Sequence, residues 1–287
     1  MSAWPAGAQS AAVVTVNFDG ESFEQPLAPG EPLWGRNSFG RYGAQVGVFR
    51  LLAVLARYGV RATFFIPGWD SERYPAVMEA IAGAGHELAG RGYANEDFSV
   101  LSVDEQRGVL ERSEDAFQRA FGQAPRGWRG PSGVGHLREP RASLVIPGSL
   151  LSGATRALLA ERGYHYDSSF CDDDLPYIVA NTAGHRLVEI PCLQTASDRP
   201  YYQVHRPPSV VAAAWRAELS ATHAAGGLFN LALSPRGDWG SGRAVRMRAV
   251  EQLLQALHET PNLWLTTCGT LADWALETAD DADMRPA

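Results

Sequence analysis

Strand-like and helix-like segments alternate along most of this chain, and this alternation limits the possible folds more than any other feature. The strand-like runs are short and β-branched or apolar, and most helix-like segments end at a glycine. The predicted strands are residues 13–18, 62–66, 87–89, 127–129, 166–168, 187–190, 228–233 and 263–266. The predicted helices are residues 46–58, 74–84, 103–121, 153–162, 209–225, 245–259 and 271–277.

A strand and helix rhythm of this kind is typical of a parallel sheet covered by helices. The first predicted strand leads into an acidic turn at residues 19–22, whereas an open doubly wound sheet carries a glycine-rich phosphate turn there. We therefore predict an α/β fold in the form of a distorted (β/α) barrel of about seven strands. The segment 26–43, which is rich in glycine and proline, is expected to be a loop.

Length and composition limit the class of protein further. With 287 residues and 45% apolar content, we expect one domain over residues 1–287, with frayed ends at 1–11 and 279–287. The net charge of −7 provides no basic surface for nucleic acid or an anionic membrane. The chain shows no signal-peptide pattern and no apolar run near the roughly 20 residues that span a bilayer, so we expect a cytoplasmic protein. Three widely spaced cysteines predict neither a disulfide framework nor a cysteine metal site.

In such barrels the functional side chains lie at the carboxyl ends of the strands. Asp19 follows the first predicted strand and is the strongest catalytic candidate, because a carboxylate at a barrel mouth can act as a general base. Since Asp-Gly is also typical of turns, a structural role for Asp19 stays open. The other predicted strand ends are residues 67–69, 91–95, 129–132, 167–169 and 234–236.

Taken together, the segments at these strand ends resemble the polysaccharide deacetylase (NodB-homology) superfamily. The resemblance is stronger to its cytoplasmic relatives that act on small amides, the allantoinase-like and cyclic-imide-hydrolase-like proteins. Each segment is a weak signal alone, but their order and spacing are specific. The segments are residues 18–21, 62–68, 84–96, 127–131, 166–169, 173–177, 189–191 and 233–235.

The resemblance also implies roles for particular residues. In the family pattern, the acidic turn supplies a general base and a metal-binding aspartate, and two histidines four residues apart complete the metal site. Asp19 matches the base and Glu21 falls near the acidic ligand, but Arg91 and Asn95 occupy the two histidine positions. A later family histidine, which assists the leaving group or stabilises charge, is matched by Ser234.

Arg91 changes the chemistry expected at this position. A guanidinium has five donors and no acceptor, so it cannot ligate a divalent ion and repels one. We therefore expect no metal and no other cofactor. Arg91 is instead expected to pair with Asp19 or Glu21, or to clamp a carboxylate or developing oxyanion of a ligand. A plain ion pair that joins two strand ends is the alternative.

A second group of side chains is expected near the barrel mouth, where aromatic residues would suit a small planar or hydrophobic ligand. Packing at the mouth is the alternative for each aromatic residue, and a surface position is the alternative for each histidine. The predicted substrate-binding residues are Trp69, Tyr93, Trp128, Arg129, His136, Asp173, Tyr201, Tyr202 and His205.

Three functions fit these observations. The first is a metal-independent enzyme that hydrolyses, isomerises or cyclises a small cyclic amide or imide, or a related acyl or carbonyl compound, with Asp19 as acid or base. The second is a catalytically inactive barrel retained as a binding protein, and the third is a conventional metal-dependent deacetylase. The expected partner is a small-molecule substrate. The resemblance implies that the protein forms homo-oligomers, which spacing alone does not show.

Overall fold

The computed structural model describes residues 4–27, 34–131, 151–180, 183–278 and 284–286. The strands in these ranges form one ten-stranded sheet. Its strand order is β10-β6-β7-β5-β4-β3-β2-β1-β8, and β9 pairs with β1. The strands are β1 Ser10–Asn17, β2 Thr63–Ile66, β3 Glu87–Gly90, β4 Gly127–Trp128, β5 Tyr166–Asp167, β6 Tyr177–Ala180, β7 Arg186–Glu189, β8 Leu228–Leu233, β9 Leu263–Thr266 and β10 Met284–Pro286.

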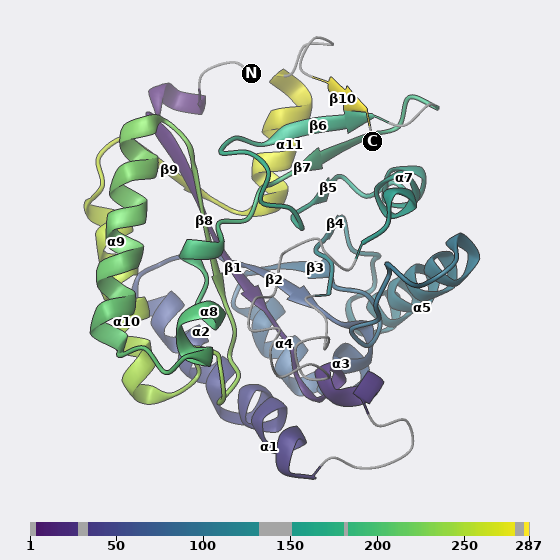
Figure 1. Ribbon diagram of the computed structural model, residues 1–287, viewed down its shortest axis with the longest axis horizontal. Coiled ribbons are helices and arrows are strands. Elements are labelled where there is room, and N and C mark those ends of the chain that lie inside the picture. Colours follow the sequence, from purple (N-terminus) through teal and green to yellow (C-terminus); the bar gives the residue numbers. More distant parts are fainter. Residues whose placement is uncertain (1–3, 28–33, 132–150, 181–182, 279–283, 287) are drawn as a thin grey trace.

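The sheet curls into a half-barrel, so the predicted distorted α/β barrel is confirmed (Figure 1). Among the described strands, β6 and β7 form the one antiparallel pair, with Tyr177 opposite Glu189. The sequence prediction missed β6 and β10, because a four-residue and a three-residue strand beside turn residues give little periodic signal. The sheet is therefore wider than the expected seven strands.

Helices cover the outer side of the sheet, and most of them connect one strand to the next. Helices α9 and α10 lie together on one side of β1 and β8, and α5 and α7 lie on the other side of the molecule (Figure 1). The helices are α1 Trp34–Tyr42, α2 Val48–Arg57, α3 Gly68–Arg73, α4 Pro75–Gly83, α5 Val103–Phe121, α7 Gly153–Glu161, α8 Arg199–Gln203, α9 Pro208–Ala225, α10 Ala244–Glu259 and α11 Cys268–Thr278. None of these helices is both long and apolar enough to cross a membrane.

Shorter helical turns complete the described chain. They are η1 Pro5–Gly7, η2 Glu21–Leu27, η3 Gly43–Gly47 and η4 Gln194–Ala196. The segment 26–43, expected to be a loop, contains α1, so that expectation is wrong for residues 34–42. The expected fraying of residues 1–11 is wrong from Trp4 onward, because its indole donates to Gly226 O at 2.8 Å and Ser10 begins β1.

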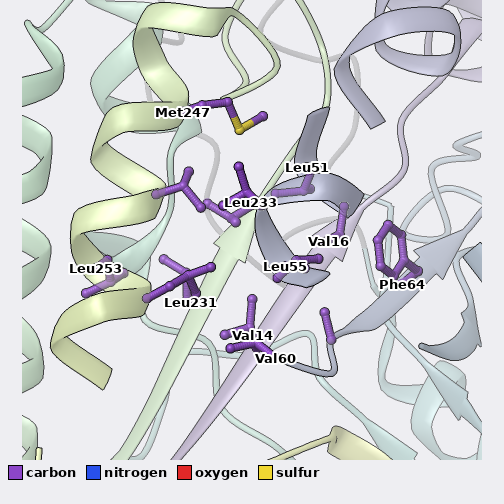
Figure 2. Close-up of a cluster of buried hydrophobic side chains, with 14 of the residues drawn as sticks. Val14, Val16, Leu51, Leu55, Val60, Phe64, Leu231, Leu233, Met247 and Leu253 are labelled. Atoms are coloured by element: carbon purple, nitrogen blue, oxygen red, sulfur yellow. The ribbon is translucent and has the colours of Figure 1, made fainter. Parts of the chain in front are cut away.

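The two faces of strand β1 differ: one packs against the outer helices, and the other becomes polar near the carboxyl end of the strand. Val14 and Val16 face the outer helices, where they pack with Leu231 and Leu233 of β8 and with α2 (Figure 2). Because side chains alternate along a strand, the residues between these valines face the opposite side. This inner face changes along β1 from apolar Val13, in a second buried cluster, to polar Thr15 and Asn17 near the carboxyl end.

Candidate functional site

A pocket of about 90 Å³ lies at the carboxyl ends of the strands. It receives side chains from the chain segments that follow β1, β3, β4, β5 and β8, and from the loop between β7 and α8. Its charged, polar and aromatic lining residues include Asn17, Asp19, Arg91, Arg129, Ser168, Ser169, Cys192, Gln194, Asp198, Arg199, Ser234 and Trp239. Five of the six strand ends nominated from the sequence therefore contribute to one cavity, and residues 67–69 are the exception.

A buried ion pair between Asp19 and Arg91 lies in this pocket. Arg91 Nε donates to Asp19 Oδ1 at 2.7 Å, and Arg91 Nη2 donates to Asp19 Oδ2 at 3.4 Å. The two side chains are 1% and 2% exposed for Arg91 and Asp19 respectively. Arg91 Nη1 also donates to the Gly130 carbonyl at 2.7 Å, so the guanidinium links the chain segments that follow β1, β3 and β4. Of the two expected partners for Arg91, Asp19 is the one it binds here.

Glu21 faces away from the pocket. Its Oε1 accepts a hydrogen bond from Arg41 Nη2 at 2.7 Å, and its Oε2 accepts one from the Tyr74 hydroxyl. The expectation of an Arg91–Glu21 pair is not met, because Glu21 begins the helical turn η2 and is directed toward α1 and α3. Burial and the bond to Glu21 both raise the pKa of Tyr74.

Asp70, which the sequence reasoning missed, holds the acidic turn in place. It accepts hydrogen bonds from Gly20 N at 2.9 Å and from Ser22 N at 3.2 Å. A Cβ atom on Gly20 would lie 2.5 Å from Asp70 Oδ1, so this approach requires glycine. Burial raises the pKa of Asp70 to about 7, although its hydrogen bonds to Ser22 and Gly20 act against the shift.

Asn95 also stabilises the acidic turn that contains Ser22, and it does not line the pocket. Its Nδ2 donates to Ser22 Oγ at 3.1 Å, and its backbone takes a left-handed φ of 60°. Asn95 Oδ1 is buried and accepts no hydrogen bond within the described part of the chain. Ser234 does line the pocket, where its Oγ accepts a weak hydrogen bond from Arg236 N at 3.4 Å.

Arg129 lines the pocket and donates hydrogen bonds to several neutral acceptors. Its Nε donates to Ser168 O at 2.7 Å, and its Nη2 reaches Ser168 Oγ at 2.7 Å. Its Nη1 donates to Thr15 Oγ1 at 2.8 Å and Asn17 Oδ1 at 3.1 Å, the polar inner face of β1. The guanidinium also lies 4.1 Å from the centre of the Phe65 ring.

Asp198 and Arg199 also line the pocket, and the sequence reasoning missed both. Asp198 Oδ2 accepts hydrogen bonds from Ser234 N and Ser241 N, each at 2.8 Å, so it fixes the loop after β8. Burial raises the pKa of Asp198 to about 7, against the effect of these backbone bonds. The signal in the sequence was an acidic residue next to a basic one at the start of α8, just before the predicted binding residues Tyr201, Tyr202 and His205.

Several predicted binding residues lie outside the pocket and serve packing, the alternative that the sequence left open. Trp128 is fully buried with its ring 5.3 Å from that of Phe98. Tyr93 donates its hydroxyl to Glu72 at 2.7 Å, and Tyr202 is buried beneath Arg246. These aromatic rings are directed into the helical layer and away from the barrel mouth.

The remaining predicted binding residues also lie away from the lining. Trp69 is half-buried and donates its backbone N–H to Tyr93 O at 2.8 Å, and Tyr201 donates its hydroxyl to Thr195 O at 3.0 Å. Asp173 pairs with Arg285 near the edge strand β10, and His205 is exposed. His136 lies outside the described residues.

The positions that the family pattern assigns to a metal ion do not fit one here. Among the described residues, no group of three or more histidine, cysteine, aspartate or glutamate side chains is placed to hold a metal. Arg91 occupies the position beside Asp19, Glu21 is engaged by Arg41, and Asn95 offers one amide oxygen. A cation at this position would meet a guanidinium with no acceptor.

The arrangement combines two carboxyl groups in different environments with several fixed cations. Asp19 is bonded to Arg91, whereas Asp198 is bonded to neutral backbone N–H groups. Two carboxyl groups held in different environments are typical of acid and base chemistry. The guanidinium groups can stabilise negative charge on a ligand. The fold and the site thus define an α/β half-barrel with a charged pocket at the carboxyl ends of its strands.

Comparisons with known proteins identify the family. The polysaccharide deacetylase family model matches residues 42–144. A crystal structure from Mycobacterium smegmatis, described as a polysaccharide deacetylase, is 30% identical with a TM-score of 0.84 and covers 99% of this chain and 95% of that one. The chain therefore belongs to the polysaccharide deacetylase family.

Two further comparisons show likeness in the fold and in half of the sequence. The crystal structure of PuuE allantoinase superposes with a TM-score of 0.82 at 22% identity, over 96% of this chain and 93% of that chain, which is a likeness of fold. A peptidoglycan deacetylase from Helicobacter pylori is 31% identical over 143 residues, which is 50% of this chain. The match covers 43% of that relative's length, so less than half of it is shared.

Proposed function

We propose that this chain is a metal-independent enzyme that acts on a small cyclic amide or imide, or on a related acyl or carbonyl compound. The observation that carries the proposal is the buried Asp19–Arg91 pair in the pocket. It combines a carboxylate that can accept a proton with a fixed cation that can stabilise an oxyanion. A pocket of about 90 Å³ suits a small ligand better than an extended sugar chain.

In the hydrolytic form of this proposal, water adds to the carbonyl carbon of the ligand and gives a proton to Asp19. Each carboxylate oxygen has two acceptor positions, so Asp19 can take this proton while it stays bonded to Arg91. The C–N bond then breaks, and its nitrogen takes a proton from a second acid. Asp198 suits that role, because burial raises its pKa to about 7. In the isomerising or cyclising form, the same two groups move a proton without adding water.

A binding protein is the second candidate function, and one observation favours it. Both oxygens of Asp19 already accept hydrogen bonds from Arg91, as expected for a carboxylate whose role is to hold a guanidinium in place. The third candidate, a metal-dependent deacetylase, requires a metal ion beside Arg91. That arrangement is electrostatically unfavourable.

Comparing wild type with Asp19→Asn tests the proposal, with succinimide and hydantoin as substrates. Since general acid or base catalysis contributes about 10²–10⁴-fold, the variant should lose rate by about that factor. Asp173→Asn, which removes a carboxylate outside the pocket, is the matched control and should retain full activity. Equal rates for wild type and Asp19→Asn would overturn the enzymatic proposal, and no turnover by wild type would favour the binding protein.

Elemental analysis of the purified wild-type protein separates the third candidate. We expect no stoichiometric metal and no loss of activity on treatment with a chelator. Bound metal together with chelator-sensitive turnover would show that the conventional metal-dependent chemistry operates instead.

A further inference from the structure

We propose that the hydroxyl oxygen of Ser169 accepts a hydrogen bond from an N–H group of the ligand, so that the pocket favours lactams, amides and imides over the corresponding esters. This inference rests on the function proposed above, because it names a feature of the ligand that the same pocket binds. Ser169 lines the pocket and is 3% exposed. It lies two residues after β5, at one of the strand ends that form the site.

A pair of buried carboxyl groups lies behind Ser169. Asp167 and Glu189 are register partners on the parallel strands β5 and β7, and both side chains are fully buried. Their two carboxyl groups are hydrogen-bonded to each other, and no donor in the described part of the chain reaches Asp167 Oδ2 or Glu189 Oε2. Because two ionised carboxylates offer only acceptors, this bond requires a proton on one of them.

The shared proton fixes the direction of the Ser169 hydroxyl. Whichever carboxyl group carries it, the proton lies between Asp167 Oδ2 and Glu189 Oε2, so Asp167 Oδ1 offers only lone pairs. Ser169 Oγ bonds to Asp167 Oδ1, and it must therefore donate its own proton there. Gly130 N donates to the same Ser169 Oγ at 2.8 Å. Since a hydroxyl oxygen has two acceptor positions, Ser169 keeps one of them for a ligand and has no proton left to donate.

The carboxyl pair is held in place by several contacts. Glu189 Oε1 accepts hydrogen bonds from Ser169 N and Phe170 N, each at 3.0 Å. Burial raises the pKa of Asp167 and of Glu189, so the shared proton stays bound near neutral pH. The single negative charge that remains is offset by Arg156, whose Nη2 lies 3.7 Å from Glu189 Oε2. The direction of the Ser169 hydroxyl is therefore set before a ligand binds.

An N–H group is the ligand feature that complements a fixed acceptor. An ester has an oxygen where an amide or imide has its N–H, so its lone pairs would face those of Ser169 Oγ. A site built to bond an N–H group rejects an analogue that lacks it, because its own buried acceptor is then left without a donor.

2-Pyrrolidinone and γ-butyrolactone form a matched pair of probes, because they share a ring size and a carbonyl group, and the lactam has an N–H where the lactone has its ring oxygen. We expect calorimetry on the wild-type protein to show the lactam binding about tenfold tighter or more. Ser169→Ala should remove most of this preference. Ser99→Ala is the matched control, because Ser99 also bonds to an aspartate two residues before it but is exposed, and it should leave the preference unchanged.

Glu189→Gln tests the shared proton separately. Its amide N–H can replace that proton as the donor to Asp167 Oδ2, so the variant should keep the preference for the lactam. It should also weaken the infrared C=O band of protonated carboxyl groups in the protein without a ligand. An unchanged band, or loss of the preference in folded Glu189→Gln, would contradict the shared proton.

Three results would overturn the inference: equal or tighter binding of the lactone, binding of neither probe, or an unchanged preference in a folded Ser169→Ala protein. Thermal melting of each variant establishes that it is folded. Because calorimetry measures binding, its failure is distinct from failure of the enzymatic proposal. A lactam preference that depends on Ser169, without turnover, would support this inference alone, whereas turnover of imides without that preference would support the enzyme alone.

Discussion

Two buried arginine arrangements lie close together at the barrel mouth, and their charge balance differs. Arg236 is fully buried beside the pocket, and its Nη2 reaches Glu24 Oε1 at 2.5 Å and Asp238 Oδ2 at 3.0 Å. Its Nη1 also donates to the carbonyls of Asp19 and Gly20, at 3.2 and 3.1 Å. One cation is thus matched by two carboxylates and joins the loop after β8 to the acidic turn.

Among the described residues that line the pocket the balance is reversed, since three carry guanidinium groups and two carry carboxyl groups. The contrast is clearest between two aspartates, the partly buried Asp238 of the cluster and the buried Asp198 of the pocket. Burial acts to raise the pKa of Asp238, but Arg236 outweighs it and lowers this pKa, whereas burial raises the pKa of Asp198 to about 7. The carboxylates of the Arg236 cluster therefore match its cation, while the described lining of the pocket holds more guanidinium groups than carboxyl groups.

The most severe test of this contrast removes one arginine from each arrangement. Arg236→Met leaves Glu24 and Asp238 without their cation, so we expect the free energy of unfolding to fall by about 3–5 kcal/mol. Arg199→Met should cost less, because burial lowers the pKa of Arg199, and Arg91 and Arg236 oppose its attraction to Asp19 and Asp238. Urea denaturation measures both losses. If Arg199→Met were as destabilising as Arg236→Met, the pocket would be as balanced as the cluster.

Much of the fold followed from the sequence, because most elements carry a clear period or a glycine stop. Helix α5 occupies residues 103–121 and strand β8 residues 228–233, as predicted. Helix α1 was missed because its Gly-containing sequence has little helical propensity. Strand β6 was missed because its signal is four residues long and its partner is antiparallel.

The site was predictable where a residue directly follows a strand. Asp19, Arg91, Arg129 and Ser234 all meet in the pocket, since parallel strands bring their carboxyl ends to one edge. Residues on loops and helices were not predictable in this way. Asp198 is joined to the loop after β8 by hydrogen bonds to residues more than thirty positions away, and no local period encodes those contacts.

The pH dependence of stability provides the next test, because the contributions of Asp198 and Asp238 change with pH in opposite directions. Since the pKa of Asp198 is raised from 3.8 to about 7, its contribution to stability is full below about pH 4 and is lost as the pH rises toward 7. Asp238 has a lowered pKa, so its contribution is lost only as the pH falls below about 4.

We therefore expect the melting temperature to fall between pH 5 and pH 8, and Asp198→Asn to reduce this fall. Asp70, whose pKa is also raised to about 7, should account for part of the remaining slope. Asp238→Asn is the control: it should lower stability at every pH in this range and leave the slope unchanged. A slope that Asp198→Asn does not alter would contradict the assignment of a near-neutral carboxyl group to the pocket.

An exposed ion pair gives the smallest expected effect and sets the scale for the others. Arg57 lies 2.5 Å from Glu251, but the two side chains are 63% and 30% exposed. Solvent screening and side-chain entropy limit such pairs to about 0.2–1 kcal/mol. A double-mutant cycle with Arg57→Met and Glu251→Gln should give a coupling energy in that range, which falls further at high salt. A coupling energy as large as the loss in Arg236→Met would mean that burial is not what strengthens the Arg236 cluster.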